Sequence, residues 1–427
     1  MRMGDTAASY RTSGNDVASE PSPYWRSVAL VFSGTAIAQM IPLLGSLAIA
    51  RIFVPAEFGI FMAWLGVAAV AGVFVTCRFE VALPLEPDGP PRAAAAMATA
   101  LTTLGMITAV ALVGFLLYPV LAERWPSMPD GLLWLLPIAI LALSAAQIWQ
   151  TWAAAEGLFR ALAAMRILQA ATITGLQITA GLLAPNAFTL AAAHVVGVFA
   201  GVLLAMLWLP PRRFVGGMNA LVGFWSRYRK FPMFSLPADS VNTLAGQLPL
   251  LVIAARFGAE AAGFVALAFR TLGAPISLMG TAVLDVFKRR ASSAWRERGE
   301  CRAEYMQTAK VLTAGSVAAS LVFLVAGEEL FVFAFGADWR GAGQAAVMLI
   351  PLFALRFVAS PLSYTIYIAE KQQLDLIWQL ALLGMTLATL FLPETYAATL
   401  LAYAVGYSLL YVFYIFLTFQ LSRGTTA

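Results

Sequence analysis

A series of apolar runs, each about 20 residues long, restricts the fold of this chain more than any other feature. A helix of about 20 apolar residues crosses the hydrocarbon core of a membrane, and the runs lack the alternation expected of an outer-membrane strand. Only 11% of the 427 residues are charged, against about 25% in a soluble domain. The sequence therefore predicts an all-α, polytopic membrane protein.

Twelve crossings are predicted, in two lobes of six helices each. They lie near residues 27–50, 58–84, 93–118, 131–155, 161–184, 187–209, 233–255, 261–285, 307–326, 342–368, 373–392 and 395–419. The predicted organisation, in chain order, is a polar cytoplasmic tail (1–26), an N-lobe (27–209), a cytoplasmic inter-lobe loop (210–231), a C-lobe (232–420) and a second cytoplasmic tail (421–427).

The basic residues predict the orientation. Lys and Arg are enriched on the cytoplasmic side of membrane proteins. If the N-terminus is cytoplasmic, most of the 27 Lys and Arg residues fall on that side, chiefly in the loops at 211–230 and 288–302. We therefore expect both termini in the cytoplasm. The net charge of +5 needs no nucleic-acid partner, because topology explains it.

Residues 231–285 are apolar enough for two crossings, yet they carry groups that lipid would not tolerate. Prolines remove backbone donors, which is allowed at membrane depth only beside protein or water; here they are Pro232, Pro237 and Pro249. Steps of four, three and four residues place a polar or bare stripe on one helical face, made by Ser235, Asp239, Asn242 and Gly246. This stretch is predicted to line an internal cavity.

The same stretch resembles an earlier one. A glutamine, an Ala-Arg pair, an Ala-Glu pair and a glycine recur in order, first as Gln39, Arg51, Glu57 and Gly59 and then as Gln247, Arg256, Glu260 and Gly263. The offset is nearly half the chain, as a duplication into two parallel halves requires. The two glutamines, together with Asn242, are candidates to line the cavity.

Four arginines are predicted at membrane depth: Arg78, Arg166, Arg270 and Arg356. Charges at that depth face protein or water and often mark a transport path, and the planar guanidinium suits a pyrophosphate because it donates paired hydrogen bonds. Arg270 and Arg356 are the first candidates to line the cavity. Arg78 could instead snorkel to the membrane surface. For Arg166 a structural ion pair with Glu156 is favoured.

Two acids are candidates for coupling or for ion pairing. Asp239 is either a site for a coupling proton or cation or a fixed partner of an arginine. Glu80 lies two residues after Arg78, so the two side chains do not face each other on a regular helix, and an arginine of another helix is the alternative partner. His194, the only histidine, is interpreted as a packing residue rather than a proton carrier.

Other classes of site lack their sequence signals. There is no P-loop, so no ATP hydrolysis is expected, and one histidine without zinc-ligand spacing predicts neither a metal site nor a cofactor. The only cysteines, Cys77 and Cys301, are not expected to form a disulfide.

Six segments together resemble a known family over nearly the whole chain beyond the N-terminal tail. They are ARIFVPAEFGIF (50–61), RFEVALP (78–84), KFPMFSLPADSVNTLAGQLP (230–249), AGFVALAFRTLGAPISLMGTAVLDVF (262–287), FGADWRGAG (335–343) and PLFALRFVASPLS (351–363). The family is the polysaccharide-export branch of the multidrug/oligosaccharidyl-lipid/polysaccharide flippase superfamily, the Wzx-like O-antigen and exopolysaccharide flippases.

This resemblance implies a MATE-like fold, with two six-helix lobes around a central cavity that opens alternately to either side of the bacterial cytoplasmic membrane. It also implies an oligosaccharide substrate on an undecaprenyl pyrophosphate carrier, membrane lipid around the protein, and a polymerase and chain-length regulator in the same pathway. Lipid II flippases commonly carry two further C-terminal helices, so the twelve crossings argue against a peptidoglycan-precursor role.

We therefore predict a flippase, a transporter rather than an enzyme. One alternative is an exporter of organic cations with the same fold, which would need a cavity of acids and aromatics, whereas the deep charges here are mostly arginines. The other is a membrane enzyme, a polymerase or ligase that acts on lipid-linked sugars, but the outer loops are short.

Overall fold

The computed structural model describes residues 23–124, 129–208 and 217–424 of the chain. These residues are helical almost throughout and contain no strand. The predicted all-α class is therefore confirmed.

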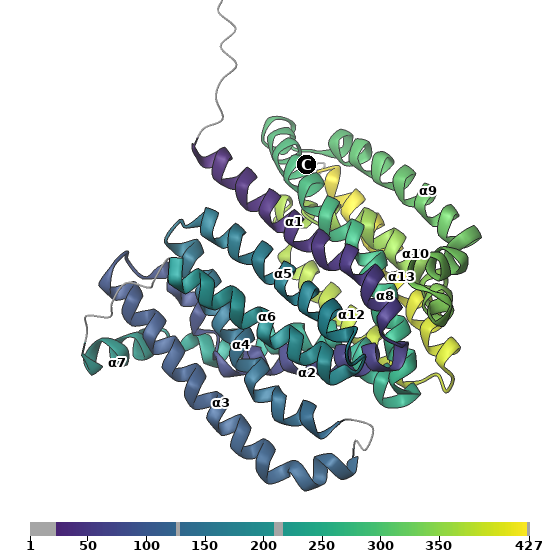
Figure 1. Ribbon diagram of the computed structural model, residues 1–427. Coiled ribbons are helices and arrows are strands. Elements are labelled where there is room, and N and C mark those ends of the chain that lie inside the picture. Colours follow the sequence, from purple (N-terminus) through teal and green to yellow (C-terminus); the bar gives the residue numbers. More distant parts are fainter. Residues whose placement is uncertain (1–22, 125–128, 209–216, 425–427) are drawn as a thin grey trace, which may run out of the picture.

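Six long helices make up the first half of the molecule (Figure 1), and we call them the N-lobe: α1 (Pro23–Ile52), α2 (Pro55–Val75), α3 (Pro90–Arg124), α4 (Asp130–Ala155), α5 (Phe159–Gly181) and α6 (Ala187–Trp208). The second half, the C-lobe, contains α8 (Leu236–Arg298), α9 (Arg302–Phe335), α10 (Arg340–Leu362), α12 (Gln372–Phe391) and α13 (Tyr396–Ser422). Short elements connect them: η1 (Phe79–Leu85), α7 (Met218–Arg227), η2 (Phe231–Ser235), η3 (Ala337–Trp339) and α11 (Thr365–Ile368).

The described helices agree with twelve membrane crossings. Ten helical segments are long and apolar enough to cross a membrane, and α1 adds a shorter apolar part at Ala36–Ile52. The long helix α8 counts once among the ten but changes direction at Gly258, whose φ of 89° is left-handed and suits glycine. Its two halves therefore serve as two crossings.

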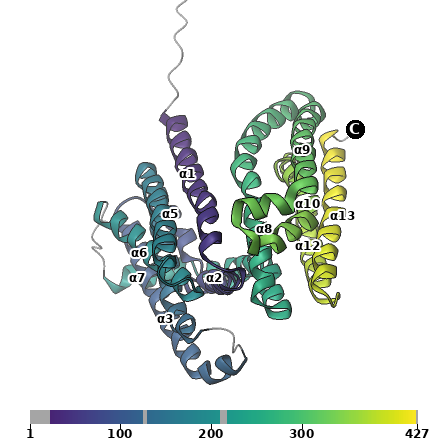
Figure 2. The ribbon, with the colours of Figure 1, turned by 45° about the vertical axis from the view of Figure 1, so that its right-hand side comes forward.

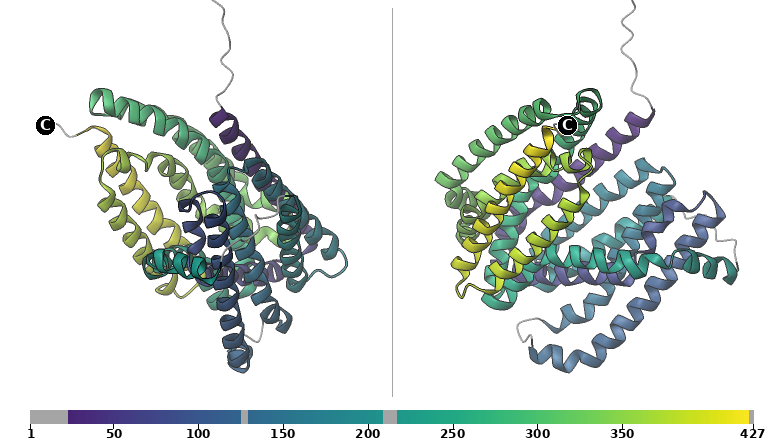
Figure 3. Two further views of the ribbon diagram at one scale, coloured as in Figure 1. Left: turned by 90° about the vertical axis from the view of Figure 1, so that its left-hand side faces the viewer. Right: turned by 180° about the vertical axis from the view of Figure 1, so that it is seen from behind.

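The two lobes lie side by side and are joined at one end (Figure 2). We call the end that holds Pro23 and Ser422 the terminal end, and the end that holds Ile52 and Pro55 the far end. In Figure 2 the lobes converge near α2 and diverge toward the terminal end. The two views of Figure 3 also place the yellow and green C-lobe helices on one side and the blue N-lobe helices on the other.

Backbone contact closes the far end. A Cβ atom at Gly59 of α2 would lie 1.8 Å from the carbonyl oxygen of Ala259, and one at Gly263 of α8 would lie 2.0 Å from the carbonyl oxygen of Pro55. Only glycine permits helices to approach so closely. These two glycines are the matching glycines of the repeated segments, so the repeat meets itself where the lobes join.

Side chains reinforce the far end. The Trp339 indole, 1% exposed, donates a hydrogen bond of 2.5 Å to the Ala50 carbonyl, and its ring meets that of Phe58 edge to face at 5.6 Å. Arg51 Nη2 donates to the Phe333 carbonyl at 2.9 Å. Each contact joins the N-lobe to the C-lobe.

A buried arginine holds the terminal end of the N-lobe together. Arg92, 5% exposed, donates to Glu156 Oε1 at 3.0 Å, to the Ala155 carbonyl at 3.1 Å and to the Glu86 carbonyl at 2.9 Å. Asp88 Oδ1 lies 2.6 Å from Arg92 Nη2. All four partners belong to the N-lobe, so this network is internal to it.

Helix α2 is shorter than predicted. It ends at Val75, and Cys77 and Arg78 adopt left-handed φ angles of 49° and 60° before η1 begins. The predicted crossing at 58–84 therefore extends too far. Its apolar end misled the sequence argument because Phe79, Ala82 and Leu83 are buried by protein, and apolar composition does not distinguish protein from lipid surroundings.

Part of the segment between the lobes is helical. Helix α7 buries Leu221 and Phe224 and leaves Met218 and Val222 exposed. The Trp225 indole donates to Thr102 Oγ1 of α3 at 2.9 Å. This short helix lies against the N-lobe at the terminal end.

Candidate functional site

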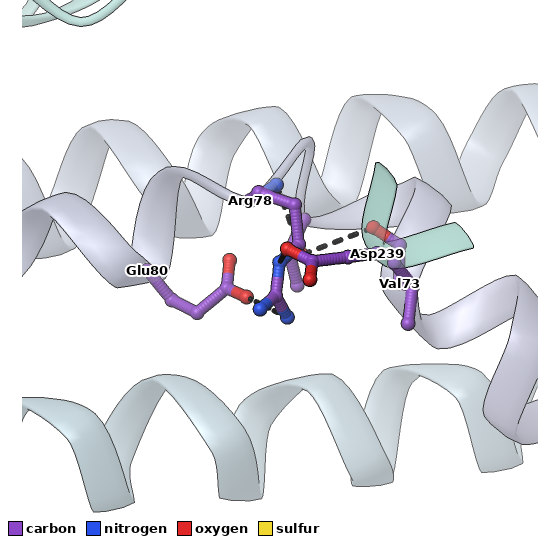
Figure 4. A network of polar contacts seen from close by, with 5 residues as sticks. Val73, Arg78, Glu80 and Asp239 are labelled. Atoms are coloured by element: carbon purple, nitrogen blue, oxygen red, sulfur yellow. Dashed lines mark hydrogen bonds and ion pairs between the residues drawn. The ribbon is translucent and has the colours of Figure 1, made fainter. Parts of the chain in front are cut away.

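Arg78 joins the two lobes at the terminal end (Figure 4). Its Nε donates to Asp239 Oδ2 of α8 at 2.7 Å, and its Nη1 donates to Glu80 Oε1 of η1 at 3.0 Å. The sequence argument that Arg78 and Glu80 do not face each other was wrong. It assumed a regular helix, whereas the left-handed turn at Arg78 brings the two side chains together.

The turn that carries Arg78 is fixed by Thr76. The Arg78 backbone N–H donates to Thr76 Oγ1 at 3.3 Å, and Thr76 Oγ1 donates to the Val73 carbonyl at 3.3 Å. Glu80 is 1% exposed, and its Oε2 has no hydrogen-bond partner in the part of the chain that the structure describes. Burial raises the pKa of the Glu80 carboxyl above its usual value, while a backbone hydrogen bond and the Arg78 charge act in the opposite direction.

Asp239 was interpreted either as a coupling site or as the fixed partner of an arginine. In the structure it forms an ion pair with Arg78. Asp239 lies in the first turn of α8 and is partly exposed. Its carboxylate neutralises Arg78 together with Glu80, so Arg78 carries no uncompensated charge. A site for a coupling ion at Asp239 stays a hypothesis.

A cavity of about 250 Å³ adjoins this ion-pair cluster, inside the N-lobe. Helices α2, α4 and α5 and the turn before η1 form its walls. We call it the amide cavity because three glutamines contribute to its polar lining, which consists of Thr76, Arg78, Glu80, Ser144, Gln147, Gln150 and Gln169.

Arg166 reaches the wall of the amide cavity instead of Glu156. Its Nε donates to Gln150 Oε1 at 3.3 Å. The favoured Arg166–Glu156 pair does not form, because Arg92 of α3 binds the Glu156 carboxylate at 3.0 Å. Arg166 is half-buried on α5.

Arg270 lies where α8 meets α1. It comes from the second half of α8, is half-buried, and donates through Nη2 to the Pro42 carbonyl of α1 at 2.5 Å. It is close enough to His194 of α6 to interact with it electrostatically. His194 is packed 5.9 Å from the Phe61 ring, and its Nε2 has no hydrogen-bond partner.

Arg356 is not joined to these groups. It is exposed on α10, and its charge acts on Tyr403 and Tyr411 of α13. Within the described ranges it makes no hydrogen bond or ion pair. The two arginines ranked first by sequence therefore occupy different surroundings, one between the lobes and one within the C-lobe.

The three amide candidates, two from the repeat and Asn242 from the polar stripe, lie in different places. Gln39 of α1 and Asn242 of α8 are exposed. Gln247 lies against α2, with its Oε1 3.1 Å from the position of a Cβ at Gly66. None of them lines the amide cavity.

The sequence argument missed the amides that do line it. Gln147 and Gln150 stand three residues apart in the otherwise apolar helix α4, so they share a helical face. The spacing of these two amides is the sequence signal that indicates a polar face on α4. Within the described ranges, no group of three or more His, Cys, Asp or Glu side chains could hold a metal ion.

Comparisons with known proteins agree with this architecture. The pattern of the family described as "polysaccharide biosynthesis protein" matches residues 48–344, more than half of the chain. No relative among the curated proteins matches the sequence.

Solved structures share the fold at low sequence identity. The lipid II flippase MurJ in an inward closed conformation is 11% identical, with a TM-score of 0.70 over 92% of this chain and 87% of that one. An inward-facing multidrug resistance MATE family transporter of the MOP superfamily is 13% identical, with a TM-score of 0.57 over 91% of this chain and 93% of that one. Its outward-facing counterpart is 14% identical, with a TM-score of 0.55 over 92% and 94%.

The predicted two-lobed, MATE-like fold is thus confirmed, and the chain is a multi-pass membrane protein with the fold of flippases and transporters. By the match across residues 48–344, it belongs to the polysaccharide biosynthesis protein family.

Proposed function

We propose that the protein flips an oligosaccharide linked to undecaprenyl pyrophosphate across the bacterial cytoplasmic membrane, for the synthesis of O-antigen or exopolysaccharide. Its family and its flippase-like fold support transport of a lipid-linked sugar. The product would serve a polymerase and a chain-length regulator. Both termini would lie in the cytoplasm, since the basic loops favour that orientation.

This proposal rests on one observation: Arg270 donates a hydrogen bond to a backbone carbonyl and has no acidic partner among the described residues. Its recorded hydrogen bond goes to a neutral acceptor, the Pro42 carbonyl, and in the described part of the chain no carboxylate forms an ion pair with it. A half-buried guanidinium without an acid attracts an oxyanion, and it can donate paired hydrogen bonds to a phosphate. Its place between α8 and α1 puts that charge at the junction of the lobes.

The arrangement of the lobes suits a substrate that enters from the terminal end. The far end is closed by the Gly59 and Gly263 contacts, while the lobes diverge toward the terminal end (Figure 2). The Arg78–Asp239 ion pair spans the lobes at the terminal end. With the terminal end in the cytoplasm, the head group would reach Arg270 between the lobes as the polyprenyl tail stays in lipid. Arg356 offers a second, exposed cation for the same anion or for the sugar. Rocking of the lobes would then open the far end.

A flipping assay tests this function. Purified protein in proteoliposomes is given fluorescent undecaprenyl pyrophosphate that carries a short oligosaccharide, and the fraction protected from external quencher is followed over time. We expect Arg270→Ala to slow flipping about tenfold or more, which corresponds to about 1.4 kcal/mol or more of lost stabilisation. Arg270→Lys should recover part of the rate, because the charge remains without the paired donors.

Arg296→Ala is the matched control, since Arg296 is exposed near the end of α8. It should flip as the wild type does. Wild-type flipping by Arg270→Ala, with the protein folded and inserted, would end the proposal that Arg270 binds the pyrophosphate.

Export of organic cations is the second candidate, because the fold is also that of a multidrug MATE transporter. An unpaired cation at Arg270 would repel such a substrate. Accumulation of ethidium in cells that produce the protein decides between the two. We expect no change, and active export of ethidium would favour the drug transporter.

A further inference from the structure

We infer that the amide cavity binds an uncharged, hydroxyl-bearing sugar unit of the head group, while Arg270 binds its phosphates. This inference rests on the proposed function and adds a second subsite to it. The subsite lies in the N-lobe, bounded by α2, η1, α4 and α5.

The cavity has the size of one sugar ring. Its volume of about 250 Å³ equals roughly eight waters at about 30 Å³ each, and it lies just below the range of about 300–1,000 Å³ typical of drug-sized ligands. Gln147 is exposed, so the cavity is not sealed. A single ring can therefore enter it while the rest of the substrate stays outside.

Two buried polar atoms in its wall lack partners. Ser144 is 2% exposed and Glu80 is 1% exposed, and among the described residues neither Ser144 Oγ nor Glu80 Oε2 has a hydrogen-bond partner. A buried polar atom left unpaired is unfavourable. A ligand hydroxyl can donate to Glu80 and can either donate to Ser144 or accept from it, so binding would satisfy both.

The glutamines supply the remaining recognition. A primary amide both donates and accepts hydrogen bonds, as a sugar hydroxyl does. The oxygen of Gln150 already accepts from Arg166, which leaves its NH₂ group for a ligand. Gln147 and Gln169 add two further amides from α4 and α5.

The charge of the cavity favours a neutral ligand. Arg78 is bonded to both Glu80 and Asp239, so its positive charge is already compensated. The unpartnered oxygen of Glu80 would repel a phosphate or a sugar carboxylate. Arg270, which has no recorded carboxylate partner, is the better phosphate ligand.

One position allows the cavity to be filled without disturbing the fold. Gly72 of α2 lines it, and a Cβ added at Gly72 meets no atom within 4 Å. Gly72→Leu should therefore place its side chain in the cavity. Gly105→Leu is the matched control, because a Cβ at Gly105 of α3 also meets nothing within 4 Å and Gly105 does not line the cavity.

The test compares equilibrium binding of two lipids to the protein in nanodiscs: undecaprenyl pyrophosphate alone, and the same lipid with a short chain of galactose units. We expect the wild type and Gly105→Leu to bind the galactosyl lipid about tenfold more tightly. Gly72→Leu should lose this preference but keep its affinity for the bare lipid within about twofold. Ser144→Ala should reduce the preference by a few-fold, since one hydroxyl contact is removed.

Arg270→Ala separates this inference from the proposed function. This variant should lower the affinity for both lipids by the same factor and leave the preference for the galactosyl lipid unchanged. A wild type that binds the two lipids equally, or a Gly72→Leu protein that keeps the preference, would overturn the sugar subsite and leave flipping untouched. Tighter binding of a glucuronic acid lipid than of the galactosyl lipid would overturn its preference for neutral sugars. If Arg270→Ala binds both lipids as tightly as the wild type does, the result would instead count against the proposed function.

Discussion

Arg92 and Arg78 lie at the same end of the N-lobe, and each binds carboxylates, but their partners come from different places. All partners of Arg92 belong to the N-lobe, and Arg92 is 5% exposed. Arg78 binds Glu80 within the N-lobe and Asp239 across the junction on α8, beside a cavity. A network inside one lobe can stay intact while the lobes rock, whereas a pair between lobes is strained or broken by the same motion. Both residues carry the same charge. What distinguishes the structural arginine from the functional candidate is whether its partners lie in the same lobe or in the other one.

Removal of Arg92 should have the largest effect on stability. Arg92→Ala leaves the Glu156 carboxylate, 14% exposed, without its cation and two carbonyls without a donor, and breaking a largely buried pair in this way costs about 3–5 kcal/mol. Denaturant unfolding in detergent measures the change, with Arg296→Ala as the exposed control. A loss of less than about 1 kcal/mol would show that the network is not what holds this end.

Removal of Arg78 should affect transport as well as stability. Arg78→Ala breaks one ion pair between the lobes and leaves the buried Glu80 carboxyl beside the amide cavity without its cation, so we expect flipping to fall about tenfold. The partly exposed contact with Asp239 should account for only about 1 kcal/mol of the free energy of unfolding, whereas loss of the contact with the buried Glu80 adds a larger cost. Both quantities are measured on the same purified protein. Full flipping activity in Arg78→Ala would place Arg78 with Arg92 as a structural residue.

A double-mutant cycle sharpens the contrast further. Arg78→Ala, Asp239→Ala and the double variant should give a coupling of about 0.5–1 kcal/mol in unfolding free energy, as expected of a partly exposed ion pair. The corresponding cycle for Arg92 and Glu156 should give a larger value, because both side chains are more buried. Equal coupling energies in the two cycles would contradict the distinction between a structural Arg92 and a functional Arg78.

The smallest effect expected is a pH dependence from Glu80. Burial raises the pKa of Glu80 in the folded protein above its ordinary value of 4.5, so the folded state holds the proton more tightly than the unfolded state. This contribution to stability is fully present below pH 4.5 and is lost as pH rises through the raised pKa. The free energy of unfolding is measured against pH for the wild type and for Glu80→Gln. The difference, wild type minus variant, should decline as pH rises above 4.5. A flat or rising difference would contradict the expectation.

The fold was predictable from sequence because its main determinant is local. Helix length and apolar composition indicate membrane crossings directly, and the repeat of Arg51 and Gly59 as Arg256 and Gly263 indicated two similar lobes. The site was predictable only in part. Arg78, Glu80 and Asp239 were found as separate candidates, but their meeting depends on a left-handed turn that a helical pattern conceals.

Competition between distant residues explains the remaining errors. Arg166 and Glu156 are close in sequence, yet Arg92, which is 64 residues from Glu156, takes the carboxylate. Arg166 then turns to Gln150. Which of two arginines reaches one acid is decided by the packing of α3 against α4, and no spacing within a single helix carries that information.

The crossing of α2 and α8 at Gly59 and Gly263 has a consequence for the whole molecule. Main chain touches main chain at this crossing, so no side chain separates α2 from α8 at these two positions. A single methyl group at either position would act as a wedge. The angle between the lobes would change, although no polar group would be altered. The absence of a side chain at Gly59 and Gly263 therefore sets the angle at which the two lobes meet.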